Sequence, residues 1–299
     1  MPSLKEVRNR ISSTVSTQQI TSAMKMVSAA KLRRAQDAVT QMRPFSKKLK
    51  EIIDNVMSAG GSSLGVFGKN RNPDKVVIVT ITSNRGLCGG FNANVIKATN
   101  QLIREKYADQ AKKGNVSIIS VGKKSTDFFK KAQMKVTSSH NELWDKLAYD
   151  SAAVVMDGLL KSYAEGTVDR VEIVYNEFKN AATQIIRIQQ MLPFTSEATP
   201  EVSIKAKDGH KTKPDYIFEP DQEEIIKDLI PYALKVHFYS SLLDSYAAEN
   251  GARMTAMHKA TDNAQELLKS LRLTYNKARQ ASITKEILEI VGGAEAINN

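Results

Sequence analysis

The chain has 299 residues, a hydrophobic fraction of 41% and an aromatic fraction of only 6%. This composition suffices for one or two domains and argues against a large aromatic-rich sandwich or barrel. The single cysteine, Cys88, excludes an internal disulfide and a cysteine-cluster metal site. The net charge is +11, and residues 1–57 alone hold eleven Lys/Arg against four Asp/Glu. This basic segment favours either a nucleic-acid surface or an acidic protein partner.

Residues 4–57 have the periodicity of a helix. They contain no glycine, and Pro44 is their only proline. The pattern predicts one helix of about 54 residues, or ~80 Å, which Pro44 should kink or end. Gly60, followed by Gly-Ser-Ser at 61–63, predicts a flexible break. The apolar positions recur every three or four residues within each run: Leu4, Val7, Ile11, Val15, Leu32, Ala35, Val39, Met42, Leu49, Ile53 and Val56.

The middle of the chain, residues 70–216, alternates between strand and helix patterns. This alternation predicts an open α/β sheet that is Rossmann-like. The last two strands are joined through Asn180 and two alanines and should form a hairpin at the end of the sheet. Residues 194–216 lack periodicity and are expected to form a surface loop. The predicted strands are 76–81, 116–122, 171–178 and 184–191, and the predicted helices are 94–107, 125–131 and 148–163.

The last part, residues 221–299, again reads as helix. Pro220 should open it, and Pro231 should kink it or mark a short preceding helix. A helix that reaches Glu295 would have ~75 residues and a length of ~110 Å. A narrow seam over about six heptads argues for a coiled coil. The seam positions are Val236, Tyr239, Leu243, Tyr246, Asn250, Met254, Met257, Thr261, Ala264, Leu268, Leu271, Tyr275 and Ala278.

Each of the two long helices has one apolar stripe that needs a partner. In the simplest arrangement the chain folds back so that the two stripes pack against each other. The expected fold class is therefore α/β, with an antiparallel two-helix coiled coil of residues 1–57 and 221–299 and a central domain of residues 70–216. With Met57 level with Asp221, facing positions add up to about 278. Met24 then faces Met254, and Ile11 faces Leu267 or Leu268.

In that register the first helix has no residue left to cover the chain beyond position 277. The last ~20 residues are nevertheless apolar in places, and an exposed apolar helix end implies a sleeve from another protein. The residues expected to contact such a sleeve are Ile283, Ile287, Leu288, Ile290 and Val291.

No motif for catalysis or metal binding emerges. The segment 82–92 lies between a strand and a helix, but its glycines fit neither a dinucleotide fingerprint nor a P-loop, so it is interpreted as a structural turn in which Cys88 is buried. The four histidines have no metal-ligand spacing, and no nucleophile–base pair is recognisable. We therefore predict no catalytic residue, no cofactor, no metal and no direct nucleotide binding.

Four segments, which make up three signatures, together resemble the gamma subunit of F-type ATP synthases, and the resemblance covers essentially the whole chain. Residues 18–31, QQITSAMKMVSAAK, look like its amino-terminal signature. Residues 83–92, SNRGLCGGFN, are similar to its central motif. Residues 252–264 and 275–286 are similar to its carboxy-terminal signature.

The resemblance implies a non-catalytic central-stalk rotor subunit. In this family the coiled coil stands inside an alpha3-beta3 hexamer, and the α/β domain is the foot on the membrane c-ring beside the epsilon subunit. Proton flow turns ring and shaft together and drives ATP synthesis at the beta subunits. The resemblance also assigns the residues that meet the beta subunits: Met24, Arg253, Arg279, Gln280 and Thr284.

The amino terminus lacks an apolar signal region, and the chain lacks the inserted cysteine pair of plant-chloroplast members. These features suggest a bacterial member, peripheral on the cytoplasmic face of the inner (plasma) membrane. Two alternatives are kept. The first is a basic coiled-coil nucleic-acid-binding protein, based on the charge of residues 1–57, and the second is a nucleotide-dependent enzyme on the central sheet.

Overall fold

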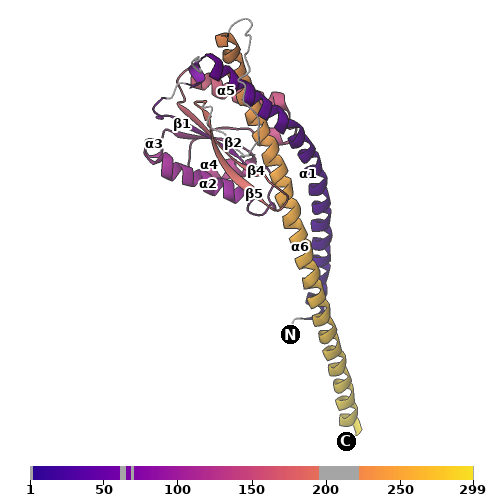
Figure 1. Cartoon of the computed structure of the whole chain (residues 1–299). Helices are drawn as coiled ribbons and strands as arrows, with labels where there is room; N and C mark the ends of the chain where they lie inside the picture. Colours follow the sequence, from indigo (N-terminus) through magenta and orange to yellow (C-terminus); the bar gives the residue numbers. More distant parts are fainter. Residues whose placement is uncertain (1–2, 61–64, 69–70, 195–221, 299) are drawn as a thin grey trace. The chain divides into compact units, whose positions relative to one another are not determined.

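The computed structural model describes residues 3–60, 65–68, 71–194 and 222–298 (Figure 1). The chain divides into two compact units. Unit 1 joins the two ends, Met1–Ala29 and Arg253–Asn299, and unit 2 is Ala30–Ala252. Two helices run through both units, α1 at Leu4–Gly60 and α6 at Gln222–Asn298. The predicted break at 61–63 and the predicted loop at 194–216, apart from its first residue, lie outside the described residues.

Unit 2 contains a five-stranded sheet of the order β3-β2-β1-β4-β5. Neighbours among the first four strands pair in parallel, and β5 pairs antiparallel with β4. The order 3-2-1-4 is that of a doubly wound sheet, which confirms the Rossmann-like expectation and the terminal hairpin. The strands are β1 (Val76–Ile81), β2 (Val116–Val121), β3 (Val136–Ser139), β4 (Arg170–Phe178) and β5 (Gln184–Leu192).

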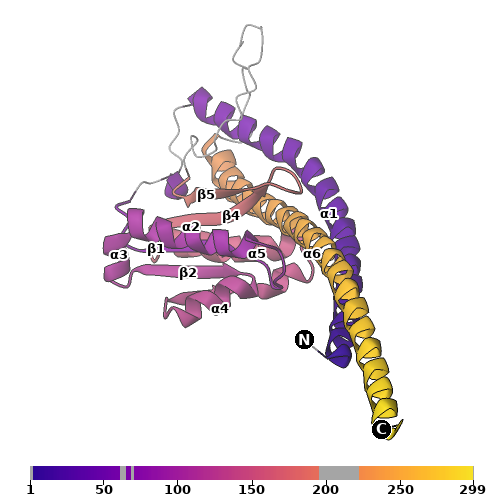
Figure 2. The same ribbon diagram turned by 90° about the horizontal axis from the view of Figure 1, so that it is seen from below.

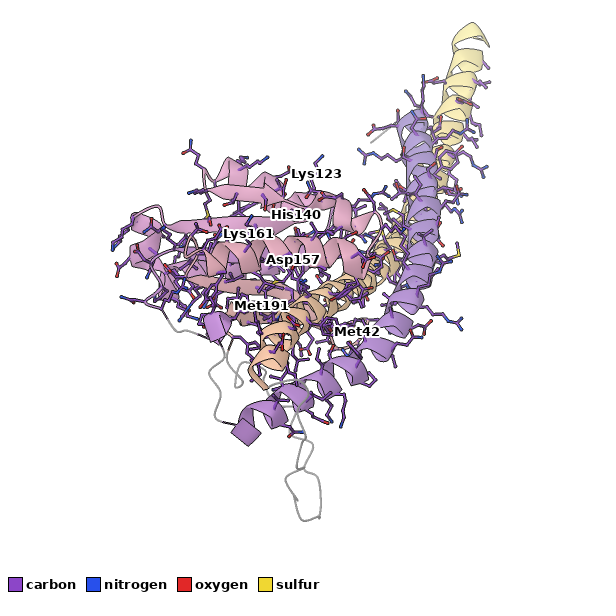
Figure 3. All side chains as sticks on the ribbon, turned by 90° about the horizontal axis from the view of Figure 1, so that it is seen from above. Met42, Lys123, His140, Asp157, Lys161 and Met191 are labelled. Carbon is purple, nitrogen blue, oxygen red and sulfur yellow. The ribbon has the colours of Figure 1, made fainter. Side chains whose placement is uncertain are left out.

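Strand β1 separates two apolar cores because its side chains alternate between the faces of the sheet. Val77 and Val79 belong to the core shared with α5 and α6, whereas Val76 and Ile78 belong to the core shared with α2 and α4. Figure 3 looks onto α5, which carries Asp157 and Lys161. The remaining helices of unit 2 are η1 (Gly65–Gly68), α2 (Phe91–Lys106), α3 (Ala108–Lys112), α4 (Lys123–Lys131), η2 (Asn141–Trp144) and α5 (Tyr149–Ala164).

Every predicted element of the sheet domain is present within three residues of its expected bounds. Four short elements were missed: β3, α3 and the two 3-10 helices. Strand β3 has the sequence Val-Thr-Ser-Ser and no buried side chain. Strand β3 forms because it pairs in parallel with β2. The residues of β2 lie outside β3, so the pattern of β3 alone does not predict the pairing.

The sequence left open whether each proline kinks or ends its long helix, and Figure 2 shows α1 and α6 as unbroken ribbons. Helix α1 continues through Pro44 and α6 continues through Pro231, so neither proline ends a helix. The two helices end at Gly60 and Asn298, three residues beyond the expected ends at Met57 and Glu295.

In unit 2, α6 is buried on nearly all sides, not along a narrow seam. Of residues 241–250, only Tyr246 is half-buried and the others are buried. Gly251 shows the tightness of this packing, since a Cβ there would lie 3.2 Å from the Cα of Ala181 in the β4–β5 turn. On the α1 side, Arg43 donates to Asp244 at 3.1 Å. The seam prediction is wrong here because the helix is sandwiched between the sheet and α1.

In unit 1 the narrow seam is confirmed. Between positions 257 and 278 the buried or half-buried residues of α6 include Met257, Thr261, Ala264, Leu268, Leu271, Tyr275 and Ala278. The Thr261 hydroxyl donates to the Thr21 hydroxyl at 2.9 Å, so facing positions add up to 282. The predicted sum of about 278 is therefore wrong by one helical turn. Apolar stripes also match after a shift of one turn, and the Thr21–Thr261 pair selects the observed register.

Candidate functional site

The end of α6 extends past the start of α1, as the yellow part of the helix in Figure 1 shows. Because α1 begins at Leu4, the register places the last covered residue of α6 near 278. From 279 to 294 every residue is exposed except the half-buried Ser282. The apolar side chains there expose about half of their surface or more: Ile283 48%, Ile287 54%, Leu288 66%, Ile290 71% and Val291 51%. The expectation of an uncovered apolar end is confirmed.

The exposed side chains of this end lie in two adjacent rows, because residues four apart stand above one another on a helix. One row is Asn276, Gln280, Thr284 and Leu288, and the other is Arg279, Ile283, Ile287 and Val291. At about 100° per residue, both rows lie away from the seam, except that Arg279 is beside it, next to the seam residue Ala278. One partner surface could therefore contact the polar and the apolar residues together.

The polar members of these rows retain hydrogen-bonding capacity. The Thr284 hydroxyl donates to the Gln280 carbonyl at 3.0 Å, which leaves the hydroxyl oxygen free to accept. The side chains of Arg279 and Gln280 are exposed and make no hydrogen bond to another residue within the described part of the chain. The site thus offers a cation and an amide on one turn and a hydroxyl oxygen on the next.

The remaining predicted contact residues, Met24 on α1 and Arg253 on α6, are both half-buried in unit 1. The methionines do not behave alike. Met257 is in the seam with 4% of its surface exposed, whereas Met26 exposes 63% and is outside the seam.

Sequence reasoning missed further exposed apolar residues in unit 1. Ile20 and Val27 on α1 expose 59% and 57%, while Leu273 on α6 exposes 64%. The seam at this level of α1 instead uses the small polar residues Thr21 and Ser28, which are buried. A test for a polar heptad at 21 and 28 would have revealed that the apolar residues beside it face outward.

The glycine-rich segment between β1 and α2 is tied together by its own side chains. The Asn92 amide accepts from the Ser83 backbone N–H at 2.9 Å and donates to the Cys88 sulfur at 3.2 Å. Cys88 is buried, as predicted. Gly122 closes the neighbouring loop at φ +107°, where a Cβ would lie 2.0 Å from the Thr82 carbonyl oxygen. These contacts have the character of a structural turn.

Across the described ranges, no cluster of His, Cys, Asp and Glu could hold a metal ion. His237 is half-buried, and desolvation lowers its pKa to about 4. No helix within those ranges is both long and apolar enough to cross a membrane.

Comparison with known proteins decides the family. The sequence model of the ATP synthase family matches residues 3–297. The ATP synthase gamma chain of Cytophaga hutchinsonii is 53% identical over the full length of both chains, and that of Flavobacterium johnsoniae is 52% identical, also over both full lengths. The chain belongs to the ATP synthase gamma chain family.

The fold is also that of solved structures. A chain of the cryo-EM structure of the Euglena gracilis mitochondrial ATP synthase, OSCP/F1/c-ring in rotational state 3, matches 98% of this chain and 94% of its own length. The TM-score is 0.68 and the sequence identity is 22%. Nothing in these comparisons supports the alternative of a nucleic-acid-binding coiled coil that the charge of residues 1–57 suggested. The gamma chain family membership accounts for the three sequence signatures at once.

Proposed function

We propose that this gamma chain is the central-stalk rotor subunit of an F-type ATP synthase. In this role it turns inside an alpha3-beta3 hexamer and couples proton flow through the c-ring to ATP synthesis. The observation that carries the proposal is the uncovered end of α6 in a member of this family. Fully burying a large apolar side chain is worth roughly 1.5–3 kcal/mol. Covering five of them that are about half exposed would therefore stabilise an assembly substantially.

The contact with the hexamer follows from the two rows on α6. A sleeve formed by the hexamer would bury Ile283, Ile287, Leu288, Ile290 and Val291. Arg279, Gln280 and Thr284 lie about two to three turns before the end of this apolar surface. They would bond to a beta subunit, and Met24 and Arg253 would contact it as well. Hydrogen bonds of charged groups contribute about 1.5–3 kcal/mol each.

Other parts of the chain would bind the c-ring and the epsilon subunit. We propose that residues 1–57 and 221–299 act as the shaft and residues 70–216 as the foot, which binds the c-ring and the epsilon subunit. The ATP chemistry then belongs to other chains, and this chain binds no nucleotide directly. The complex would lie on the cytoplasmic face of a bacterial inner membrane, with this chain held there through the c-ring.

The test replaces Gln280 and Thr284 by alanine in the assembled complex. We expect ATP synthesis and hydrolysis per complex to fall several-fold while assembly continues, because contacts made only during rotation are lost. A matched control is Ser270→Ala with Thr274→Ala, which removes the same kind of hydroxyl-to-carbonyl bond upstream on α6. Unchanged rates per assembled complex in the first variant would refute the contact with a beta subunit.

A further inference from the structure

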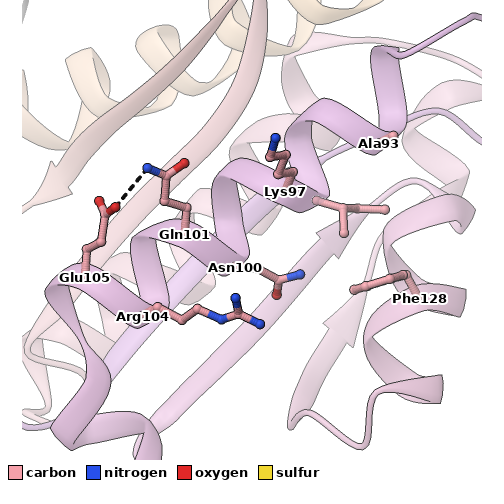
Figure 4. A pocket seen from close by; sticks show the side chains of 8 residues that line it. Ala93, Lys97, Asn100, Gln101, Arg104, Glu105 and Phe128 are labelled. Carbon is pink, nitrogen blue, oxygen red and sulfur yellow. Dashed lines mark hydrogen bonds between the residues drawn. The ribbon is translucent and has the colours of Figure 1, made fainter.

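A groove in unit 2 lies between α2 and α4, and its lining takes no residue from α1 or α6. It has a volume of about 640 Å³. Ala93, Ile96 and Phe128 supply apolar lining, and Asn100 and Arg104 supply polar lining. Figure 4 shows Asn100 and Arg104 projecting from α2 on the side where Phe128 borders the groove from α4. Phe128 exposes 41% of its surface although its neighbour Phe129 is fully buried.

The groove is surrounded by cations without acidic partners. Lys97 and Arg104 line it from α2, and Lys124 and Lys131 share the exposed face of α4 with Phe128, at i, i+4 and i+7. None of these four residues forms an ion pair within the described parts of the chain. Elsewhere in unit 2, exposed lysines do pair with carboxylates, as in Lys48–Glu51 and Lys161–Glu165.

The cations outnumber the carboxylates at the groove. Glu105 also lines it, but it accepts a hydrogen bond from Gln101 at 2.9 Å, and Figure 4 shows this pair on the other side of α2 from Asn100. Asp127 is the only carboxylate in the α4 sequence KKSTDFFKK, against four lysines. The local field therefore attracts a negatively charged ligand.

We propose that this groove binds an acidic amphipathic helix of a partner protein. The lining residues Ala93, Lys97, Asn100 and Arg104 are spaced i, i+4, i+7 and i+11 along α2. They form a stripe about three turns, or ~16 Å, long, which matches the length over which one helix packs along another. Apolar side chains of the partner would contact Ile96 and Phe128, and its carboxylates would pair with the four cations.

The concave shape favours a helix over a membrane surface. A flat bilayer would meet the exposed lysines but would leave the half-buried Ile96 uncovered. The groove lies within the proposed foot, residues 70–216, and uses none of the residues assigned to the hexamer. The inference goes beyond the proposed function because it adds a helix-binding site to the foot.

Binding can be measured with the full-length chain and a defined probe. The probe is a fluorescent, hydrocarbon-stapled 18-residue helix with leucines at i, i+4, i+7 and i+11 and glutamates flanking them. We expect saturable binding in fluorescence anisotropy, weakened at least tenfold when the glutamates are replaced by glutamine and further weakened when the salt is raised from 0.05 to 0.5 M.

Two variants locate the binding. The triple variant Lys97→Gln, Arg104→Gln, Lys124→Gln removes charge from the groove alone, and Phe128→Ser removes the exposed ring; each should weaken binding at least tenfold. The matched control, Lys259→Gln, Lys269→Gln, Lys277→Gln, removes three exposed lysines from α6 and should bind like the parent chain. Circular dichroism verifies that each variant is folded.

Three outcomes would overturn the proposal. The first is no saturable binding of the acidic probe, and the second is equal weakening by the groove and control variants. The third is binding to phosphatidylglycerol vesicles that depends on the groove cations while the acidic helix does not compete. The rates of the assembled complex with Gln280 and Thr284 replaced test the rotor proposal separately, so the two can fail independently.

Discussion

At the scale of single residues, Asp244 illustrates how burial changes chemistry. The side chain is buried, and it accepts from Arg43 at 3.1 Å. Burial raises its pKa to about 6, although Arg43 partly opposes this shift. The folded-state pKa is thus above the unfolded value of 3.8. Such a group favours folding below the unfolded pKa, and this contribution is lost as the pH rises through about 6.

We therefore expect Asp244→Asn to stabilise unit 2 at pH 8, on the order of 1–3 kcal/mol, and to lose this advantage below about pH 4. The measurement is urea unfolding followed by the fluorescence of Trp144, the single tryptophan, which stacks on Tyr246 of α6. The contrasting variant Arg43→Ala should destabilise at pH 8 because it leaves the buried carboxylate unpaired. A stability difference between Asp244→Asn and the parent that is independent of pH would contradict this account.

At the scale of elements, the register of α1 against α6 in unit 1 is decided by a few contacts. The Thr21–Thr261 hydrogen bond places facing residues one turn away from the register expected from the helix ends. Heptad stripes repeat, so a shift of one turn still matches apolar residues with apolar residues. Only a specific polar pair distinguishes the two arrangements.

Disulfide trapping distinguishes the registers. In a Cys88→Ser background, Thr21→Cys with Thr261→Cys should oxidise rapidly, because the two hydroxyl oxygens are already 2.9 Å apart. The control pair, Thr21→Cys with Met257→Cys, corresponds to the register in which positions add up to 278 and should remain mostly reduced. Mobility on non-reducing gels reports the outcome. Preferential oxidation of the control pair would instead support the register in which facing positions add up to 278.

At the scale of the whole molecule, the chain keeps a folded α/β unit together with an apolar helix end that the chain itself does not cover. Exposed apolar patches of this kind mark interaction surfaces, and they drive self-association when the partner is absent. The exposed side chains between 279 and 294 contribute no buried contact to the rest of the chain. The end of α6 should therefore be dispensable for folding.

Deleting residues 285–299 tests this separation. The isolated truncated chain should unfold at the same urea concentration as the parent by Trp144 fluorescence and should self-associate less in sedimentation velocity. The control Lys285→Ala with Glu289→Ala removes an ion pair of 3.5 Å on another side of the helix and should leave self-association unchanged. A truncated chain that unfolds at lower urea would show that the end stabilises the fold.

Local patterns in the sequence were sufficient for most elements. The β-branched run 76–81 indicates a buried strand, and helical spacing carries α1 and α6 over 57 and 77 residues. The uncovered apolar end at 283–291 also follows from helix lengths alone. These features depend on residues that are close together in the sequence, so local patterns are enough to predict them.

Other features depend on contacts between segments that are far apart in the sequence, so they appear only in the folded chain. The tertiary structure buries residues 241–250 on nearly all sides, although their pattern predicts a seam, because the sheet and α1 both pack on α6. It adds strand β3, which has little apolar signal, because β2 offers it hydrogen bonds. It also brings α2 and α4 together as a groove. In each case the energy comes from contacts between segments far apart in sequence, which no local periodicity encodes.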